Sequence, residues 1–460
     1  MNTLIILSAL GVLALFSEML NFKKALLPLI MLGLVGALAA DVMDWNLNKS
    51  FYNNMITVDN YSVAFTGLLI VITLLWFIMS PEFFHEPTSR VDHFALIIFA
   101  LVGAQLMTSY SNMLMLFLGI EILSIPMFIL AGSNKSDLNS NEAALKYFLM
   151  GAFATGFLLF GIALIYGATG SFNIQTIAQF VFGQQGNFPV MIIAGVLMML
   201  VGLAFKVSAA PFHFWAPDVY TGSPTVITAF MSTVVKTAAF AGFFRLFFTC
   251  FNTGNAVWTN TIWVLAALTI IIGNLTAVSQ TNFKRMLAYS SIAHAGYMLL
   301  AILSVSGSRE YAQGSVLFYA AAYSISSITS FAVLLLVSHI TKSDSIDSFN
   351  GLAKKNPLLA FVTVLAMLSL AGIPPMAGFF AKYYVFTAAL QQHYTGLVLI
   401  AVAGSLVGVF YYFRIIIAMF KTETEGVDVP VTNVFGAFLV VTSLAALLLG
   451  IMPQLVAGLL

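Results

Sequence analysis

Long, continuously apolar runs separated by short polar segments dominate the chain. A helix needs about 20 apolar residues to cross the roughly 30 Å of hydrocarbon in a bilayer. Applied along the sequence, this length predicts fourteen spans, at residues 2–21, 24–41, 59–80, 92–108, 110–132, 142–168, 189–220, 223–249, 258–279, 283–305, 311–340, 357–393, 395–420 and 431–457. A transmembrane β-barrel would show alternating polar and apolar residues, which these runs lack. The pattern predicts an all-α membrane protein with a single membrane domain, residues 1–460.

The seventh and twelfth runs are too long for one straight helix, and both contain proline, which removes a backbone donor and interrupts a helix. We expect breaks at Pro211 and at the pair Pro374 and Pro375. Span seven runs inward and span twelve outward, as two inverted five-helix repeats would require. The predicted organisation is an N-terminal three-helix segment, two repeats made of spans four to eight and nine to thirteen, and a C-terminal helix, at residues 1–90, 91–250, 257–421 and 430–460. In the sequence the repeat is visible only as a weak similarity between SNMLML at 111–116 and TNFKRML at 281–287.

Basic residues set the expected orientation, because cytoplasmic loops of membrane proteins carry an excess of Lys and Arg. Loops after even-numbered spans hold only Lys49 and Arg309. Loops after odd-numbered spans hold Lys23, Lys24, Arg90, Lys135, Lys284, Arg285, Lys342, Lys354, Lys355 and Lys421. We therefore expect the odd loops in the cytoplasm and both termini on the outer side.

Composition agrees with a membrane protein and excludes several other classes. Hydrophobic residues make up 60% and charged residues 8% of the chain, against roughly 25% charged in ordinary soluble domains, and the mean hydropathy is +0.99. A net charge of +1 offers no basic face for nucleic acid. The one cysteine, Cys250, excludes an intramolecular disulfide and a cysteine-based metal site. No nucleotide-binding or metal-binding motif is present, so we expect no cofactor and no metal on this chain. The apolar N-terminus has no basic region before it, and we interpret it as a membrane helix, not a removed signal.

Five titratable residues interrupt the apolar runs near mid-span: Glu121, Lys206, Lys236, His294 and Lys382. Counted from the span ends, all five lie at a similar depth, in a row parallel to the membrane plane. A charge inside hydrocarbon is costly and needs a partner or a water-lined cavity, which marks such residues as candidates for function. His294 has a simpler alternative, since a neutral histidine bonded to a neighbouring carbonyl would be unremarkable.

The residue types in this row favour proton handling. A desolvated lysine can release its proton and a nearby carboxylate helps to retain it, whereas arginine stays charged. We expect Glu121 to pair with Lys206 in this way. Sodium and calcium ions are bound by clusters of carboxylates, and the sequence has no such cluster at mid-depth. Water and free backbone groups at the two helix breaks would provide a path for protons.

Charges near the span ends have a different interpretation. Anchoring at the membrane interface is expected for Glu18, Arg245, Arg414 and His339. Lys146 lies one turn into span six with Glu142 at i−4, an order that suits a helix ion pair. Its depth makes Lys146 a candidate for a relay or for an entrance from the cytoplasm.

Several long segments resemble a known family. FKVSAAPFHFWAPDVYTGSPT, STVVKTAAF and SLAGIPPMAGFFAKYYVF closely resemble the antiporter-like membrane subunits of respiratory complex I. The resemblance covers nearly the whole chain, including LGIEILSIPMF and NFKRMLAYSSIAHAGYML, and within the family it is greatest to the subunit N group of bacterial NADH–quinone oxidoreductase, the counterparts of mitochondrial subunit 2. The sister subunit M has a glutamate where Lys382 stands, and subunit L has an additional lateral helix.

The resemblance implies a proton-translocating subunit of the membrane arm, driven by quinone reduction in other subunits. It implies that Glu121 is the fifth-helix glutamate, Lys206 its partner, Lys236 the central lysine of the eighth helix and Lys382 the terminal lysine of the twelfth. FMN, iron–sulfur clusters and quinone are implied only in other subunits. The implied neighbours are subunits K and M and the lipid bilayer, in a bacterial inner membrane with both termini periplasmic.

Two alternatives stay open from the sequence. Subunits of multi-subunit cation/proton antiporters share the broken helices and the lysines. A scaffold without transport would need each buried lysine to be paired or neutral, and the chain offers one mid-depth carboxylate for several basic groups.

Overall fold

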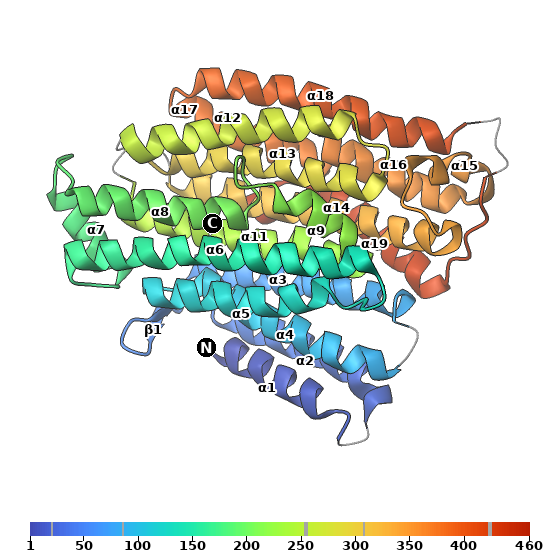
Figure 1. Cartoon of the computed structure of the whole chain (residues 1–460), viewed down its shortest axis with the longest axis horizontal. Coiled ribbons are helices and arrows are strands. Elements are labelled where there is room, and N and C mark those ends of the chain that lie inside the picture. Colours follow the sequence, from blue (N-terminus) through green and yellow to red (C-terminus); the bar gives the residue numbers. More distant parts are fainter. Residues whose placement is uncertain (20–21, 85–86, 253–255, 307–308, 422–425) are drawn as a thin grey trace.

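The protein is a bundle of long helices that lie side by side (Figure 1). It is described by a computed structural model that covers all residues except 20–21, 85–86, 253–255, 307–308 and 422–425. Eleven helices of the described residues are long and apolar enough to cross a membrane. Helices suit hydrocarbon because they satisfy every backbone group internally. The strand β1 and the short helix α7 lie at one end of the bundle, and α15 lies at the other (Figure 1).

The N-terminal segment contains three helices and one hairpin. Residues 20–21 of the predicted first span lie outside the described part of the chain. The elements are α1 (Asn2–Phe16), α2 (Leu26–Met43), β1 (Lys49–Phe51), β2 (Ile56–Val58) and α3 (Asn60–Met79). The hairpin is antiparallel, pairing Lys49 with Val58, and the hydropathy pattern did not predict it because it lies in a short polar loop. Asp59 begins α3 by accepting a hydrogen bond from the Ser62 amide at 2.8 Å.

The predicted first repeat contains the first helix break. Span seven is divided into α8 and α9, with Pro211 between them, as predicted. Span eight is continuous but includes one π-helical turn. The elements are α4 (Pro87–Ser109), α5 (Met113–Ala131), α6 (Leu138–Thr169), α7 (Ile174–Gly183), α8 (Val190–Lys206), α9 (Trp215–Gly222), α10 (Thr225–Phe230), the π turn Met231–Val235 and α11 (Lys236–Cys250). The helix α7 was not predicted, because it is too short to be identified as a span.

The predicted second repeat and the C-terminus follow the same plan. Pro374 and Pro375 separate α16 from α17, again as predicted. The elements are α12 (Ala256–Val278), α13 (Phe283–Leu303), α14 (Arg309–Thr341), α15 (Leu352–Lys355), α16 (Pro357–Ala371), α17 (Ala377–Gln391), α18 (Thr395–Met419), α19 (Asn433–Ile451) and α20 (Gln454–Ala457). Short 3₁₀ turns occupy Lys23–Ala25, Ser80–Glu82, Ser304–Ser306 and Ile346–Phe349.

Matching backbone contacts support the predicted repeat. Asn112 caps α5 and forms an isolated bridge with Asn173, while Asn282 caps α13 and forms one with Ser345. Asn112 and Asn282 lie inside the SNMLML and TNFKRML segments. In each half, the helix that the asparagine caps packs closely on the preceding helix, α5 on α4 and α13 on α12. A Cβ added at Gly103 would lie 2.4 Å from the Leu123 amide nitrogen, and one added at Gly273 would lie 2.6 Å from that of Ala293. Each residue named in the second repeat follows its counterpart in the first by about 170 positions. Small residues such as glycine permit such close helix packing.

Two arginines extend this correspondence. The Arg245 guanidinium donates to the carbonyls of Tyr110 at 2.9 Å and Thr108 at 3.2 Å. Arg414 donates to the carbonyls of Val278 at 2.8 Å and of Gln280. Both arginines thus bind carbonyls at the C-terminal end of the first helix of their half, which are left without intrahelical partners.

Arg245 lies beside span ends, as expected, since its partners Asp59 and Tyr110 directly precede α3 and follow α4, but it is buried and not exposed at the surface. Its side chain is 8% exposed and forms a bidentate pair with Asp59, at 3.0 and 2.8 Å. The guanidinium has five donors in a planar fork, so it can bind the carboxylate and two carbonyls at once and be buried. Burial raises the pKa of a carboxyl, but at Asp59 the Arg245 guanidinium and the bonds from Ser62 outweigh it, and the pKa lies below its usual value.

We expect Asp59→Asn to destabilise the protein, because it leaves the buried Arg245 without its counter-charge. The free energy of unfolding should fall by about 3 kcal/mol. This is the low end of the range for breaking a buried ion pair, since Asp59 is partly exposed. Because the folded-state pKa is depressed, the pair stabilises fully above the unfolded value of about 3.9 and loses this effect as the pH falls through the folded pKa. Thermal melting of the purified protein in detergent would measure it, with the exposed Asp428→Asn as the control. Equal melting temperatures for the two variants at pH 7 would contradict the expectation.

Candidate functional site

Lys236 lies near the middle of the span formed by α10, the π turn and α11, and it is only 3% exposed. Its Nζ donates to the Ser291 carbonyl at 2.7 Å and to the hydroxyl of the same residue. The π turn ends at the residue directly before Lys236. Such single turns are rare within α-helices and occur frequently at functional sites.

Lys206 is the last residue of α8, directly before the first helix break. It is buried, and its Nζ donates to the Ser124 hydroxyl of α5 at 2.6 Å. A positive charge is favoured in the last turn of a helix, where the unpaired carbonyls gather. Within the break, the Ala210 amide donates to the Thr269 hydroxyl at 2.8 Å, and the Trp215 indole donates to the Phe205 carbonyl at 3.0 Å. Side chains thus supply partners that the broken helix lacks.

Lys382 lies in α17, just after the second break, and reaches back across it. Its Nζ donates to the carbonyl of Ala371, the last residue of α16, at 2.7 Å, and to the Ser405 hydroxyl at 2.8 Å. The residue after Ala371 is Gly372, which has φ of +81°. A Cβ on Gly372 would lie 2.8 Å from Lys382 Cδ and 3.0 Å from its Nζ. Glycine therefore makes room for this lysine.

His294 lies near the centre of α13 and is 4% exposed. Its Nδ1 is 2.6 Å from the Tyr319 hydroxyl and its Nε2 is 3.2 Å from the Tyr412 hydroxyl. Its partners are hydroxyl groups, not the backbone carbonyl of the alternative interpretation. Both ring nitrogens are therefore in contact with groups that can donate or accept a proton.

These residues form a buried polar line from span eight to span twelve. Lys236 Nζ is 6.0 Å from the centre of the Tyr323 ring, which is 4.9 Å from that of His294. On the other side, the Tyr297 ring centre is 5.8 Å from that of His294 and 5.3 Å from Lys382 Nζ. Both lysines act electrostatically on His294. The structure thus brings three of the five predicted residues together.

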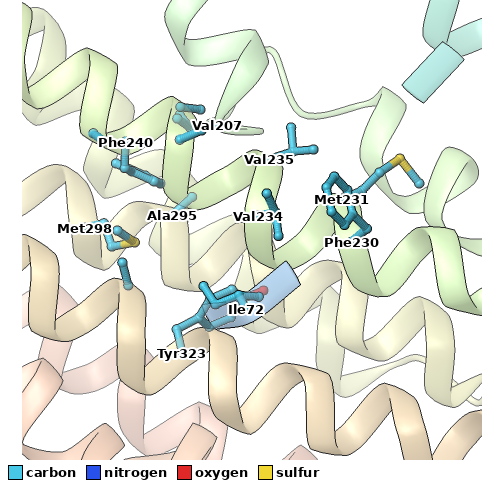
Figure 2. Packing of buried hydrophobic residues seen from close by; sticks show 14 of the residues in the cluster. Ile72, Val207, Phe230, Met231, Val234, Val235, Phe240, Ala295, Met298 and Tyr323 are labelled. Carbon is cyan, nitrogen blue, oxygen red and sulfur yellow. The ribbon is translucent and has the colours of Figure 1, made fainter. Parts of the chain in front are cut away.

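Lys206 and Lys236 each adjoin a buried apolar residue in the sequence, Val207 and Val235. Figure 2 shows Val207, next to Lys206, in one cluster with Val235 and Phe240 of span eight and Ala295 of α13. These side chains are all buried. Proton movement between Lys206 and Lys236 would require water to enter this cluster, which makes it a point where transfer can be controlled.

Glu121 and Lys206 do not form the expected pair by direct contact. Ser124, one turn after Glu121 on α5, accepts the Lys206 bond. Glu121 is half-buried and acts on Lys206 electrostatically, but no ion pair within 4 Å joins these two residues. The carboxylate influences the lysine without neutralising it by direct contact.

A wide cavity of about 900 Å³ opens at the end of the bundle that carries the odd-numbered loops. Lys146 lies in its wall and forms ion pairs with Glu142 at 2.6 Å and Asp218 at 2.7 Å. Asp218 also binds Arg285 at 3.0 Å. The predicted pair of Glu142 and Lys146 is confirmed, and Asp218 extends it to the segment after the first helix break.

The residues that hold the lysines and the histidine were not identified from the sequence. They are Ser124, Ser291, Tyr319, Ser405 and Tyr412. One signal existed in YSSIAH, where Ser290 and Ser291 lie one turn from His294 and so share its face of the helix. Hydroxyl groups are otherwise common in membrane helices and do not mark a site alone.

The described residues contain no group of three or more His, Cys, Asp or Glu that could hold a metal ion. The side chains of the site are hydroxyl, amine, imidazole and carboxyl groups. Their chemistry is the transfer of protons.

Comparisons with known proteins agree on one family. Residues 111–408 match the family described as NADH:quinone oxidoreductase/Mrp antiporter, TM. NADH-quinone oxidoreductase subunit N of Cytophaga hutchinsonii is 45% identical over 459 residues, which cover 99% of this chain and 98% of that protein. A chain of respiratory complex I from Thermus thermophilus with bound aureothin has a TM-score of 0.85 and 35% identity, covering 99% of this chain and 98% of that one. A chain of the Mrp complex from Dietzia sp. has a TM-score of 0.85 at 19% identity, covering 99% and 95%, and shares the fold alone.

We expect Gly372→Ala to destabilise the protein more than Gly170→Ala. Both glycines have left-handed backbones, with φ of +81° and +69°, where another residue costs about 1–2 kcal/mol. An added Cβ meets nothing within 4 Å at Gly170 but meets Lys382 at Gly372. The first variant should therefore also displace Lys382 from its acceptors. Thermal melting of both variants in detergent measures the difference, and equal losses would show that Gly372 does not position the lysine.

Proposed function

Because the chain belongs to the NADH:quinone oxidoreductase/Mrp antiporter membrane family, we propose that protons cross the membrane along its row of buried titratable side chains. The protein is a proton-translocating subunit of the membrane arm of NADH:quinone oxidoreductase. Relatives named subunit N match it over the full length at 45% identity, whereas the Mrp chain is 19% identical. The cation/proton antiporter alternative has the fold in its favour but no comparable sequence match.

One observation carries the proposed proton path. Each of Lys206, Lys236 and Lys382 is buried and donates to hydroxyl or carbonyl oxygens. Among the described residues, no carboxylate lies within 4 Å of any of the three. A lysine paired with a carboxylate would hold its proton firmly, while one bonded to neutral oxygens can give it up and remain hydrogen-bonded. This argues against a scaffold in which the lysines are fixed in ion pairs.

In this proposal each residue has a defined part. The cavity beside Lys146 and Asp218 admits protons from the cytoplasm. Lys206, under the influence of Glu121, receives them, and Lys236 passes them through His294 to Lys382. The breaks at Pro211 and at Pro374 and Pro375 place helix ends beside the first and last lysine.

The wider assembly follows from the family. The protein is part of a multi-subunit complex, and other membrane-arm subunits are its partners. We place subunits K and M as its neighbours, and FMN, iron–sulfur clusters and quinone in other subunits, so that this chain carries no redox centre. We also place it in the bacterial inner membrane with both termini periplasmic.

The orientation can be tested with single cysteines, since the chain has only the buried Cys250. Asn139 is exposed and lines the wide cavity, and Gln175 is exposed on α7 at the other end of the bundle. We expect a membrane-impermeant maleimide to label Asn139→Cys in inverted vesicles and Gln175→Cys in intact spheroplasts, as read by mass spectrometry of this chain. Labelling in the reverse pattern would invert the proposed orientation and the entrance with it.

We expect Lys236→Met to reduce the protons moved per quinone reduced, while the complex assembles and NADH:quinone activity stays measurable. Methionine keeps the length of the side chain but cannot carry a proton. Lys421→Met, the same change at an exposed position, serves as the control. Proton uptake and release by vesicles during NADH oxidation measures the ratio. A normal ratio in Lys236→Met would remove this lysine from the path.

A further inference from the structure

His294 is held between two tyrosine hydroxyls, and this contact suggests how protons cross α13. The Tyr319 hydroxyl lies 2.6 Å from Nδ1 and the Tyr412 hydroxyl 3.2 Å from Nε2. Tyr412 is also hydrogen-bonded to the Ser290 hydroxyl. These contacts order four groups as Ser290, Tyr412, His294 and Tyr319. Each is at most 4% exposed, so the chain of hydrogen bonds is screened from bulk water and lipid.

The lysines do not contact this histidine directly. Among the described residues, no hydrogen bond joins Lys236 or Lys382 to the His294 ring, whose polar partners are the two tyrosines. Lys236 is instead bonded to Ser291, the residue next to Ser290. A proton that travels between the lysines by way of His294 must therefore pass through the tyrosine hydroxyls or through water that replaces them.

A small cavity continues the chain beyond Tyr319. It has a volume of about 10 Å³, close to the space needed by one water molecule. Its lining includes Tyr319, Ser326 and Ser369, together with Gly378 and Ala381, the last being the neighbour of Lys382. Ser326 donates to Ser369 at 2.7 Å, and Ser369 in turn accepts from the Gly378 amide at 3.3 Å. Ser326 and Ser369 thus place hydroxyl groups at a cavity whose surface is otherwise mostly apolar, between Tyr319 and the second helix break.

We propose that Tyr412 and Tyr319 are proton-relay residues that carry protons across His294 between the two lysines. This inference rests on the proposed function and adds the groups that make the transfer. Tyr412 gives its proton to Nε2 and takes one from Ser290. The Nδ1 proton passes to the Tyr319 oxygen, whose own proton moves into the small cavity toward Lys382.

The step is balanced at every atom. One proton enters at Ser290 and one leaves at Tyr319, while each oxygen ends with one proton as before. His294 stays neutral and changes only from the Nδ1–H to the Nε2–H tautomer. Before the next transfer the hydroxyl groups must rotate back and the ring must regain its first tautomer. This requires water that enters the site to take the Nε2 proton and to give one to Nδ1, because a return through the two tyrosines would carry the proton back.

We expect Tyr412→Phe and Tyr319→Phe, made in the intact complex, to lower the protons moved per quinone reduced as much as Lys236→Met does. Phenylalanine fills the same volume without the hydroxyl. The control is Tyr110→Phe, which also removes a buried hydroxyl with one hydrogen bond, to the Gly242 carbonyl at 2.8 Å, but lies outside the chain of contacts. Pumping in the relay variants equal to that of the control would overturn the proposal.

Two further measurements separate a relay from a structural role. If both residues serve one path, Tyr412→Phe combined with His294→Gln should pump no less than either single variant. The proton pumping that remains in the relay variants should be slowed more by deuterated water than pumping in the unaltered complex. A change in packing alone would not produce this difference. Ser290→Ala gives the same test with a smaller change if a tyrosine variant fails to assemble, and it too should lower the ratio. Reduced pumping in Lys236→Met with normal pumping in all three relay variants would reject the relay but leave the proposed function, whereas normal pumping in Lys236→Met would remove that lysine from the path and with it the relay between the two lysines.

Discussion

The whole structure depends on keeping positive charge inside hydrocarbon. An ammonium at this depth is costly unless oxygen atoms take the place of water around it. A continuous helix offers few, because its own backbone bonds use the carbonyls, although a carbonyl can accept a second bond, as that of Ser291 in α13 does from Lys236. The two breaks change this, since the end of a helix leaves carbonyls without partners. Lys206 occupies the last turn of α8, and Lys382 donates to the terminal carbonyl of α16. The proline-containing breaks therefore place helix ends beside Lys206 and Lys382, whereas Lys236 lies in an unbroken span and is held by Ser291 of α13.

Neutral partners have a further consequence for function. A direct carboxylate would stabilise the ammonium form and make the proton hard to remove. Hydroxyl and carbonyl oxygens satisfy the donors but add no full negative charge, so the balance between the two protonation states can be changed by a nearby charge or by water. Glu121 acts on Lys206 from beyond contact distance, which suits an influence that can be strengthened or weakened. In the proposed path, hydration of the apolar cluster around Val207 and Val235 would be a second control.

Much of the fold follows from the sequence, because the length of an apolar run and the position of proline are local properties. The helices coincide with the predicted runs, and both breaks occur at the predicted prolines. The β1–β2 hairpin and α7 were missed, since short elements in polar loops have no hydropathy signal.

The titratable residues were found because charge is rare in hydrocarbon. Their hydroxyl partners were not, because serine and tyrosine are ordinary in membrane helices and only tertiary packing shows that Ser124 meets Lys206. The partner of Arg245 was missed for the same reason, since Asp59 lies at the start of another helix, far away in the sequence.

The two halves share their framework but not their charges. The glycines of the first helix crossing, the asparagine caps and the two arginines correspond at a spacing of about 170 residues. At the same spacing Glu121 corresponds to Ser291, Ser124 to His294 and Lys236 to Ser405. Each of these three pairs sets a titratable residue in one half against a hydroxyl in the other. Each serine is also the partner of a buried lysine, since Ser124 accepts from Lys206, Ser291 from Lys236 and Ser405 from Lys382. A fully symmetric set would place a second lysine beside Lys382 and a histidine beside Lys206, which raises the cost of burial, and a carboxylate beside Lys236, which would hold its proton firmly. Replacing one member by serine keeps the hydrogen bond and removes the second charge, so the asymmetry leaves each buried lysine with a neutral hydroxyl partner.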